Sequence, residues 1–201
     1  ISGATNDTYT PPTSAVGTIY YYVKATSSGS GCGDTSSNTA AVIVVTGSPG
    51  YWIGGYDTNW SVSRNWCGGV PDSTVNVVIP DVSLTTGNFP VISDSAYSHN
   101  LNIEDGASLT INSASGNLAL YGDLSLDPTA VYSHTNGKIV FSGSTSQTVA
   151  TITAYDVVVK NSGGVTLDGN LTVSNQLTLA NGVITTGSDT VIVTDTAANS
   201  I

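Results

Sequence analysis

Methionine is absent from this chain, and side chains that carry a positive charge are scarce. The four cations are Lys24, Arg64, Lys138 and Lys160, against 14 acidic residues, and the formal net charge is −10. A protein that binds the phosphate backbone of a nucleic acid needs a basic face, and four scattered cations do not form one. The composition therefore excludes nucleic acid as a partner and disfavours an anionic membrane surface.

Long apolar runs and helical periodicity are also missing. No run reaches the roughly 18 apolar residues that would span a bilayer, so we expect no membrane insertion. No segment shows the apolar spacing of a helix, and no signal peptide opens the chain. Because the first residue is Ile1, we expect a processed or excised piece of a longer protein. Low charge without methionine is typical of an extracellular structural protein.

The sequence does contain a short motif, which repeats between residues 100 and 193. Each unit alternates polar and apolar residues over about four positions, which is the period of a half-buried strand. Gly, Asn or Asp follows most units and predicts a turn after each strand. The units are residues 100–103, 108–111, 117–120, 123–126, 138–141, 156–159, 164–167, 170–173, 176–179 and 190–193.

The spacing of these units predicts how they stack. The units that start near Leu101, Leu118, Ile139, Val157 and Leu177 lie 17 to 21 residues apart. That period is typical of a parallel β-helix, in which five coils would stack at about 4.8 Å. An antiparallel meander is the alternative, because the last units also follow each other at six-residue intervals. Variable turn lengths and the lack of Asn-Gly hairpin pairs favour the helix.

The first 46 residues differ in character from the rest. They contain two good strands, at 18–26 and 39–45, a weaker strand at 7–10 and a connection rich in Gly and Ser at 27–38. Three strands do not complete a sandwich of about seven. We therefore predict that residues 1–46 are the C-terminal part of an Ig-like β-sandwich. Its missing strands would lie upstream in the natural chain or come from a neighbouring copy.

The remaining residues are predicted to form one capped stack. Residues 47–50 are a linker, 51–98 a Trp-rich cap with the first strands, and 99–201 the β-helix coils. A stacked helix exposes sheet edges at its ends and needs caps. All three tryptophans fall within residues 52–66, directly before the ladder. The predicted fold class is thus all-β, a partial Ig-like β-sandwich followed by a parallel β-helix.

The sequence also resembles a known kind of protein. Residues 51–80 (YWIGG…NWCGGVP…VNVVIP), 89–92, 100–111 and 137–148 are similar to modules of large repetitive adhesin-like surface proteins of Bacteroidota, exported by the type IX secretion system. Residues 1–46 resemble the Ig-like repeats of the same proteins. The resemblance implies a secreted or cell-surface location, and roles in stalks, adhesion, filaments, gliding or biofilms.

The resemblance bears on the two cysteines, Cys32 and Cys67. Exported proteins can form disulfides, and a Cys32–Cys67 bridge would join the Ig-like part to the cap. In similar Ig-like repeats the first cysteine pairs within its own domain. In similar cap modules a cysteine precedes the first ladder strand, where this chain has Ser98. Both cysteines lack those partners here, so the cross-domain bridge and two unpaired thiols stay open alternatives.

Bacteroidota also O-glycosylate Asp-Ser or Asp-Thr pairs that precede a small or aliphatic residue. Sequences of this form make candidates of Ser73, Ser95, Thr190 and Thr196.

Polysaccharide-degrading enzymes occur among parallel β-helices, and their chemistry needs clustered carboxylates or a basic residue beside bound calcium. Here Glu104 is the only Glu and Arg64 the only Arg. Asp123 and Asp127 flank the two ends of one predicted strand, and Asp168 is predicted to be a turn residue. We therefore predict that the protein is not an enzyme.

Metal and sugar sites have weak candidates near the cap. No His or Cys spacing suits a transition metal. Asp57, Asp72 and Asp81 are candidates for binding calcium as a cofactor, although solvated turn aspartates are favoured.

An aromatic platform is the other candidate near the cap. Trp52, Trp60, Trp66 and Tyr56 could stack on a sugar, but we favour tryptophans that fill the cap.

The function predicted from the sequence is a non-enzymatic structural or adhesive module of a secreted surface protein or extracellular fibre. Its partners would be neighbouring repeats or copies of the same protein, together with surface glycans. A carbohydrate-binding module that uses the Trp cluster is the first alternative, and a β-helix polysaccharide-degrading enzyme is the second.

Overall fold

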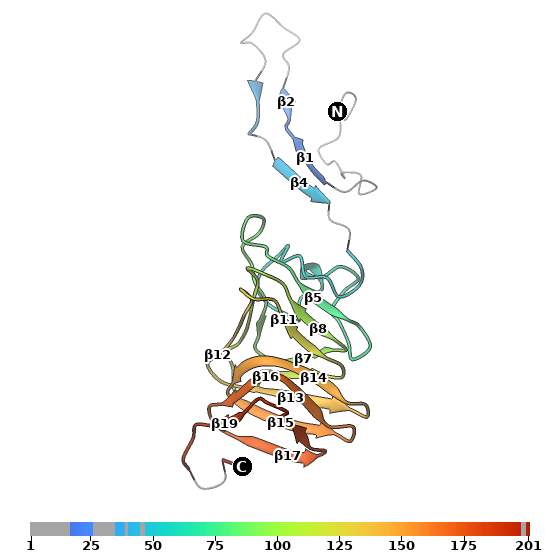
Figure 1. Cartoon of the computed structure of the whole chain (residues 1–201). Coiled ribbons are helices and arrows are strands. Elements are labelled where there is room, and N and C mark those ends of the chain that lie inside the picture. Colours follow the sequence, from blue (N-terminus) through green and yellow to red (C-terminus); the bar gives the residue numbers. More distant parts are fainter. Residues whose placement is uncertain (1–16, 26–34, 39, 45–46, 198–199) are drawn as a thin grey trace, which may run out of the picture. The chain divides into compact units, whose positions relative to one another are not determined.

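The computed structural model describes residues 17–25, 35–38, 40–44, 47–197 and 200–201 (Figure 1). The chain divides into two compact units, Ile1–Thr46 and Gly47–Ile201. Regular structure in the described residues is β-strand, apart from one 3-10 turn, η1 (Ser63–Asn65). The predicted all-β class is therefore confirmed. None of the described segments is a helix with the length and hydropathy that a bilayer crossing requires.

The first unit contains two antiparallel strand pairs. Strand β1 (Gly17–Tyr21) pairs with β4 (Ala40–Val44), and β2 (Lys24–Ala25) pairs with β3 (Thr35–Ser36). Strands are therefore present inside both segments predicted to be good strands. The weaker strand predicted at 7–10 lies outside the described residues. The described pairs do not by themselves show an Ig-like sandwich.

The second unit is a parallel β-solenoid of about six turns, where the spacing of the repeats predicted five. Its strands form a seven-stranded sheet (order β18-β16-β14-β11-β8-β5, with β19 also paired to β16), a five-stranded sheet (β17-β15-β13-β10-β7) and a three-stranded sheet (β12-β9-β6). All strand pairs in these sheets are parallel, which rules out the antiparallel meander. The strands are β5 (Val77–Ile79), β6 (Val91–Ile92), β7 (Ser95–Ser98), β8 (Leu101–Ile103), β9 (Ser108–Ile111), β10 (Asn117–Leu120), β11 (Leu124–Leu126), β12 (Val131–His134), β13 (Lys138–Gly143), β14 (Gln147–Ala154), β15 (Asp156–Asn161), β16 (Val165–Val173), β17 (Leu177–Asn181), β18 (Ile184–Thr185) and β19 (Val191–Val193).

The register of the five-stranded sheet agrees with most of the predicted period. Leu118, Ile139, Val157 and Leu177 stack on one another in successive coils. Leu101 does not belong with them, because it stacks between Val77 and Leu124 in the seven-stranded sheet. Its expected place is taken by Ala96, which pairs with Leu118. The small side chain of Ala96 made this strand hard to recognise in the sequence.

The core consists of columns of inward side chains that run from coil to coil. Leu120, Phe141 and Val159 are successive members of one column, and each is fully buried. Burial of each such side chain contributes about 1.5–3 kcal/mol. Leu179, the next member in the last coil, is 51% exposed. In this column a side chain is thus fully buried only where another coil lies on each side of it.

A cluster of three tryptophans lies against the first coil. Backbone bridges join Tyr51 to Val78 and Asn59 to Val91, both parallel, so this segment follows the edge of β5 and β6. Trp52, Trp60 and Trp66 are buried, and the Trp66 ring meets the other two edge to face, with ring centroids 4.8 and 4.6 Å apart. The Trp52 Nε1–H donates to the Asn88 carbonyl at 2.7 Å, and the Trp66 Nε1–H donates to the Trp60 carbonyl at 2.6 Å.

Asn65, at the end of η1, organises the loop around this cluster. Its side chain is fully buried, and its Oδ1 accepts hydrogen bonds from the Tyr56 and Asp57 amides. Its Nδ2 donates to the Asp57 carboxylate at 2.7 Å and to the Asn59 carbonyl at 2.8 Å. The Asn65 side chain therefore accepts from two backbone amides and also donates to a carboxylate. No other side chain of this size can do both.

This geometry predicts a pH-dependent defect in the variant N65D. A carboxylate at position 65 would face the Asp57 carboxylate and lose both donors, so its pKa in the folded state would rise above the unfolded value of about 3.9. The folded variant would then bind more protons than the unfolded chain, and its stability would fall as the pH rises from about 4 to 7. Urea unfolding, followed by tryptophan fluorescence, measures this.

The matched control is N59D, because Asn59 is exposed and its Oδ1 only accepts the Ser61 amide, which a carboxylate can also do. The control should unfold like the parent chain to within about 0.5 kcal/mol. A loss of stability in N65D that is the same at pH 4 and pH 7 would contradict the proposed role of Asn65.

Candidate functional site

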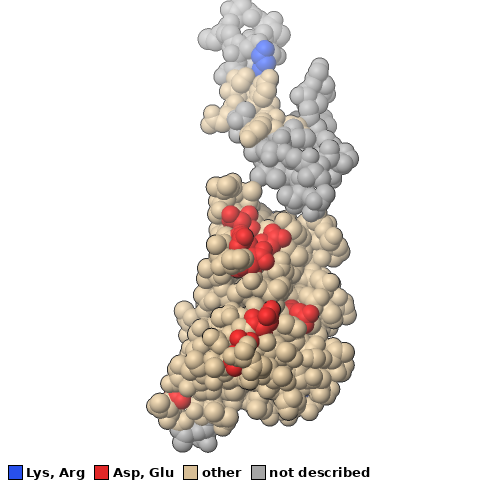
Figure 2. All heavy atoms as spheres, viewed as in Figure 1, with Lys and Arg blue, Asp and Glu red and all other residues tan. Residues whose placement is uncertain are grey.

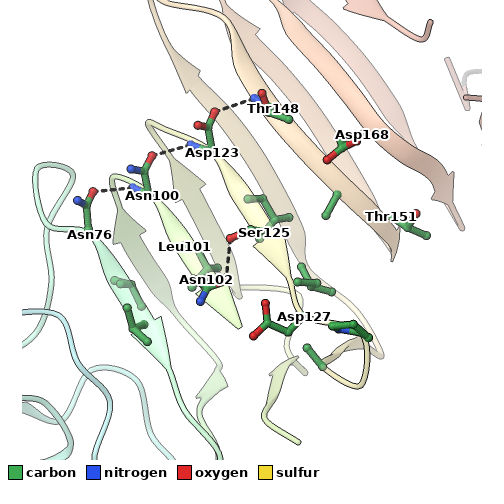
Figure 3. A pocket seen from close by; sticks show the side chains of 17 residues that line it. Asn76, Asn100, Leu101, Asn102, Asp123, Ser125, Asp127, Thr148, Thr151 and Asp168 are labelled. Atoms are coloured by element: carbon green, nitrogen blue, oxygen red, sulfur yellow. Dashed lines mark hydrogen bonds between the residues drawn. The ribbon is translucent and has the colours of Figure 1, made fainter. Parts of the chain in front are cut away.

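An open hollow with a volume of about 820 Å³ lies on the outer face of the seven-stranded sheet (Figure 3). We call it the sheet groove. Strands β5, β8, β11, β14 and β16, from five successive coils, contribute to it, so the groove runs along the stack rather than along one strand. Its lining consists of Asn76, Val77, Val78, Asn100, Leu101, Asn102, Asp123, Leu124, Ser125, Leu126, Asp127, Pro128, Ala130, Thr148, Ala150, Thr151 and Asp168.

The groove coincides with a change in coil length. Leu124 pairs with Val149, 25 residues later, whereas Val149 pairs with Leu167, only 18 residues later. The longer coil has a turn at residues 127–130 between β11 and β12, whereas β14 continues through a bulge as one eight-residue strand. The turn of the longer coil therefore borders the groove beside Thr151 of the shorter coil.

Outward side chains in the groove form rows along the stack, because the parallel register places equivalent positions above one another. Along each strand these outward residues alternate with the buried residues of the core. The first row consists of Asn76, Asn100, Asp123 and Thr148, and the second of Val78, Asn102, Ser125, Ala150 and Asp168.

The first row is a ladder of hydrogen bonds from backbone to side chain. The Asn100 amide donates to Asn76 Oδ1 at 3.2 Å, and the Asp123 amide donates to Asn100 Oδ1 at 2.8 Å. The Thr148 amide donates to Asp123 Oδ1 at 2.7 Å (Figure 3). Each side chain thus holds the start of the next coil, and this ladder fixes the register of four coils.

Several polar groups that line the groove are available to a ligand. Ser125 Oγ donates to Asn102 Oδ1 at 2.8 Å, which orients the Asn102 amide. Within the described part of the chain, the Nδ2 groups of Asn100 and Asn102 and the carboxylates of Asp127 and Asp168 have no hydrogen-bond partner. Amide donors and carboxylate acceptors therefore line the same groove.

The groove is negatively charged. Asp123, Asp127 and Asp168 line it, and none of its lining residues is Lys or Arg. Figure 2 shows carboxylates gathered on the face of the solenoid turned to the viewer, and no lysine or arginine of residues 47–201 is visible there. An anionic ligand would be repelled from this face.

The three calcium candidates do not form a joint site. Asp57 Oδ1 accepts the Asn59 amide, Asp72 Oδ1 accepts the amide and hydroxyl of Thr74, and Asp81 Oδ1 accepts the Ser83 amide. Hydrogen bonds from Thr74 lower the pKa of Asp72, and those from Ser83 lower the pKa of Asp81. Across the described ranges, no group of three or more His, Cys, Asp and Glu side chains could hold a metal ion.

The three tryptophans fill the cap, as the sequence favours over a sugar platform. Their rings are at most 4% exposed, because they cover one another and pack into the core, so no ring face is open to a sugar. Tyr56 is the exception among the predicted contacts, since it is 62% exposed, with the Arg64 guanidinium 5.6 Å from its ring centroid.

The cysteine and glycosylation hypotheses stay predictions. Cys67 is partly buried, and burial raises the pKa of its thiol. Cys32 lies outside the described residues, and so does the proposed bridge between the two. Of the candidate glycosylation residues, Ser95, Thr190 and Thr196 are exposed and Ser73 is partly exposed.

Sequence reasoning missed the groove because its acidic residues are far apart along the chain. It placed Asp123 and Asp127 correctly at the two ends of one strand, β11. It was wrong about Asp168, which lies within the nine-residue strand β16 and not in a turn. Gly169 has a positive φ of 140° and its backbone packs against Thr151, and the register shifts there without ending the strand. A glycine beside Asp168 suggested a turn that the fold does not contain.

The ladder predicts a local effect of the variant N100A. The Asp123 amide would lose its acceptor, and a hydrogen bond of this kind contributes about 1 kcal/mol. Its hydrogen exchange, measured by NMR, should therefore become roughly five-fold faster. The control is N102A, because Asn102 Oδ1 accepts only a hydroxyl and not a backbone amide. Equal exchange of the Asp123 amide in the two variants would show that the ladder does not hold this coil.

Comparison with known proteins shows one similarity. Residues 51–137, which contain the tryptophan cluster and the first coils, match a family model described as a domain of unknown function (DUF8693). No curated protein and no solved structure matches the chain.

Proposed function

We propose that the protein is a non-enzymatic structural and adhesive module of a secreted surface protein or extracellular fibre. The observation that carries this proposal is the unbroken column of buried side chains through successive coils, such as Leu120, Phe141 and Val159. No coil can bury its face alone, so the stack resists bending and local opening as a unit. A stiff element of this kind suits a stalk or fibre that holds an adhesive surface away from its attachment point.

The location and partners are part of the same proposal. Resemblance to adhesin-like proteins of the type IX secretion system favours export to the cell surface. Neighbouring repeats or copies of the protein are the partners we propose. The antiparallel pairing of β1 with β4 is compatible with residues 1–46 as the last part of an Ig-like β-sandwich.

The arrangement of the carboxylates supports a non-enzymatic role. Asp123 and Asp127 flank the two ends of β11, and their backbones are roughly 13 Å apart at about 3.3 Å per residue. Paired carboxylates that hydrolyse glycosidic bonds lie roughly 5–9.5 Å apart. The groove also lacks a lining Lys or Arg that could assist proton abstraction. We therefore assign the groove to binding rather than to catalysis.

A flow experiment tests this proposal. Beads that carry the full chain should be retained under shear on glass coated with the same chain or with surface polysaccharides, and heat-unfolded chain should not retain them. The same polysaccharides, incubated with the soluble chain, should release no new reducing ends. Lack of retention on both surfaces would refute adhesion. Sugar release that disappears in the D123N/D127N double variant would establish an enzyme.

A further inference from the structure

We propose that the sheet groove binds an uncharged glycan strand, which lies along the stack and contacts one coil after another. This inference rests on the proposed adhesive function and names the ligand class of its contact surface. The proposed contact surface lies on the seven-stranded sheet and not on the tryptophan cluster. Most of its polar residues follow Trp66 by 35 or more positions in the sequence.

The dimensions of the groove suit an extended oligomer. Adjacent strands of a sheet are about 4.8 Å apart, so the five strands that line the groove span about 19 Å. That length accommodates several sugar rings in a row. Polar side chains recur on each of the first three strands, at Asn102, Ser125 and their neighbours in the first row. A ligand with a repeating set of hydroxyl groups would meet polar side chains in successive coils, at Asn102 and at Ser125.

The chemistry of the unpaired groups points to hydroxyls. A sugar hydroxyl both donates and accepts, as the hydroxyls of Ser and Thr do. The Nδ2 groups of Asn100 and Asn102 are donors, and the carboxylates of Asp127 and Asp168 are acceptors, and all four line the same groove. Because Ser125 occupies Asn102 Oδ1, the free side of that amide is its donor side.

The negative charge of the groove restricts the class of ligand further. Three aspartates would repel an anionic glycan. A cationic ligand would satisfy the carboxylates but leave the amide donors of Asn100 and Asn102 without acceptors when it covers them, and such groups are costly to bury. An uncharged glycan satisfies both kinds of group. Val78 and Ala150, which are partly buried members of the second row, give its C–H faces an apolar contact.

The test is an NMR titration of the full ¹⁵N-labelled chain with defined oligosaccharides. The uncharged probes are cellohexaose, mannohexaose and laminarihexaose, the anionic probe is oligogalacturonate, and the cationic probe is a chitosan hexamer. At least one uncharged probe should shift the amide signals of Asn102 and Ser125, and the shifts should persist at high salt. The charged probes should bind at least ten-fold more weakly.

A matched pair of variants locates the site. S125L fills the centre of the groove and should weaken binding at least ten-fold. S142L makes the same change on the outer face of the five-stranded sheet and should bind as the parent chain does. Unchanged amide signals away from each substitution show that both variants fold.

Three outcomes would overturn the proposal. They are no shift with any uncharged probe at 10 mM, equal loss in S125L and S142L, or salt-sensitive binding of the chitosan hexamer alone. After any of these outcomes the proposed adhesive function would still hold if chain-coated beads are retained on chain-coated glass. The two proposals can therefore fail separately.

Discussion

The structure of residues 47–201 depends on the parallel register that places each coil directly over the one before. Because this register is kept, inward aliphatic side chains form continuous columns and outward polar side chains form rows. A slip of one residue between two coils would exchange the two sets and expose the core. The ladder through Asn100 and Asp123 opposes such a slip at the point where each coil begins. The parallel register therefore produces both the buried core and the rows of polar side chains in the groove.

The other distinctive features arise where this regularity is interrupted. At the start of the stack the coil has no predecessor, and three buried tryptophans, organised by Asn65, cover it instead. In the middle the coils shorten by several residues, and the longer turns before that step border the groove. A perfectly uniform solenoid would have neither a distinct first end nor a hollow on its side.

Much of this fold could be predicted from local pattern, and the site could not. Alternation of polar and apolar residues revealed the strands, and their period revealed the stacking of Leu118, Ile139 and Val157. The same period misplaced Leu101, because the corresponding residue of its coil is only an alanine. The groove residues belong to different coils, 18 to 25 residues apart at unequal intervals, so no fixed spacing marks them as neighbours. The role of Asn65 could not be predicted, because three of its four hydrogen-bond partners are backbone groups. The pattern of side chains in the sequence does not indicate where backbone groups lie.

The half-exposed Leu179 of the last coil has a consequence for how the stack forms. A strand with its inward residue uncovered is a template, on which an extended segment can gain both a hydrogen-bonded neighbour and an apolar contact. The tryptophan end offers no such surface, since its rings are already buried. Among residues 47–201, a further extended segment could therefore add beside Leu179 but not on the tryptophan cluster.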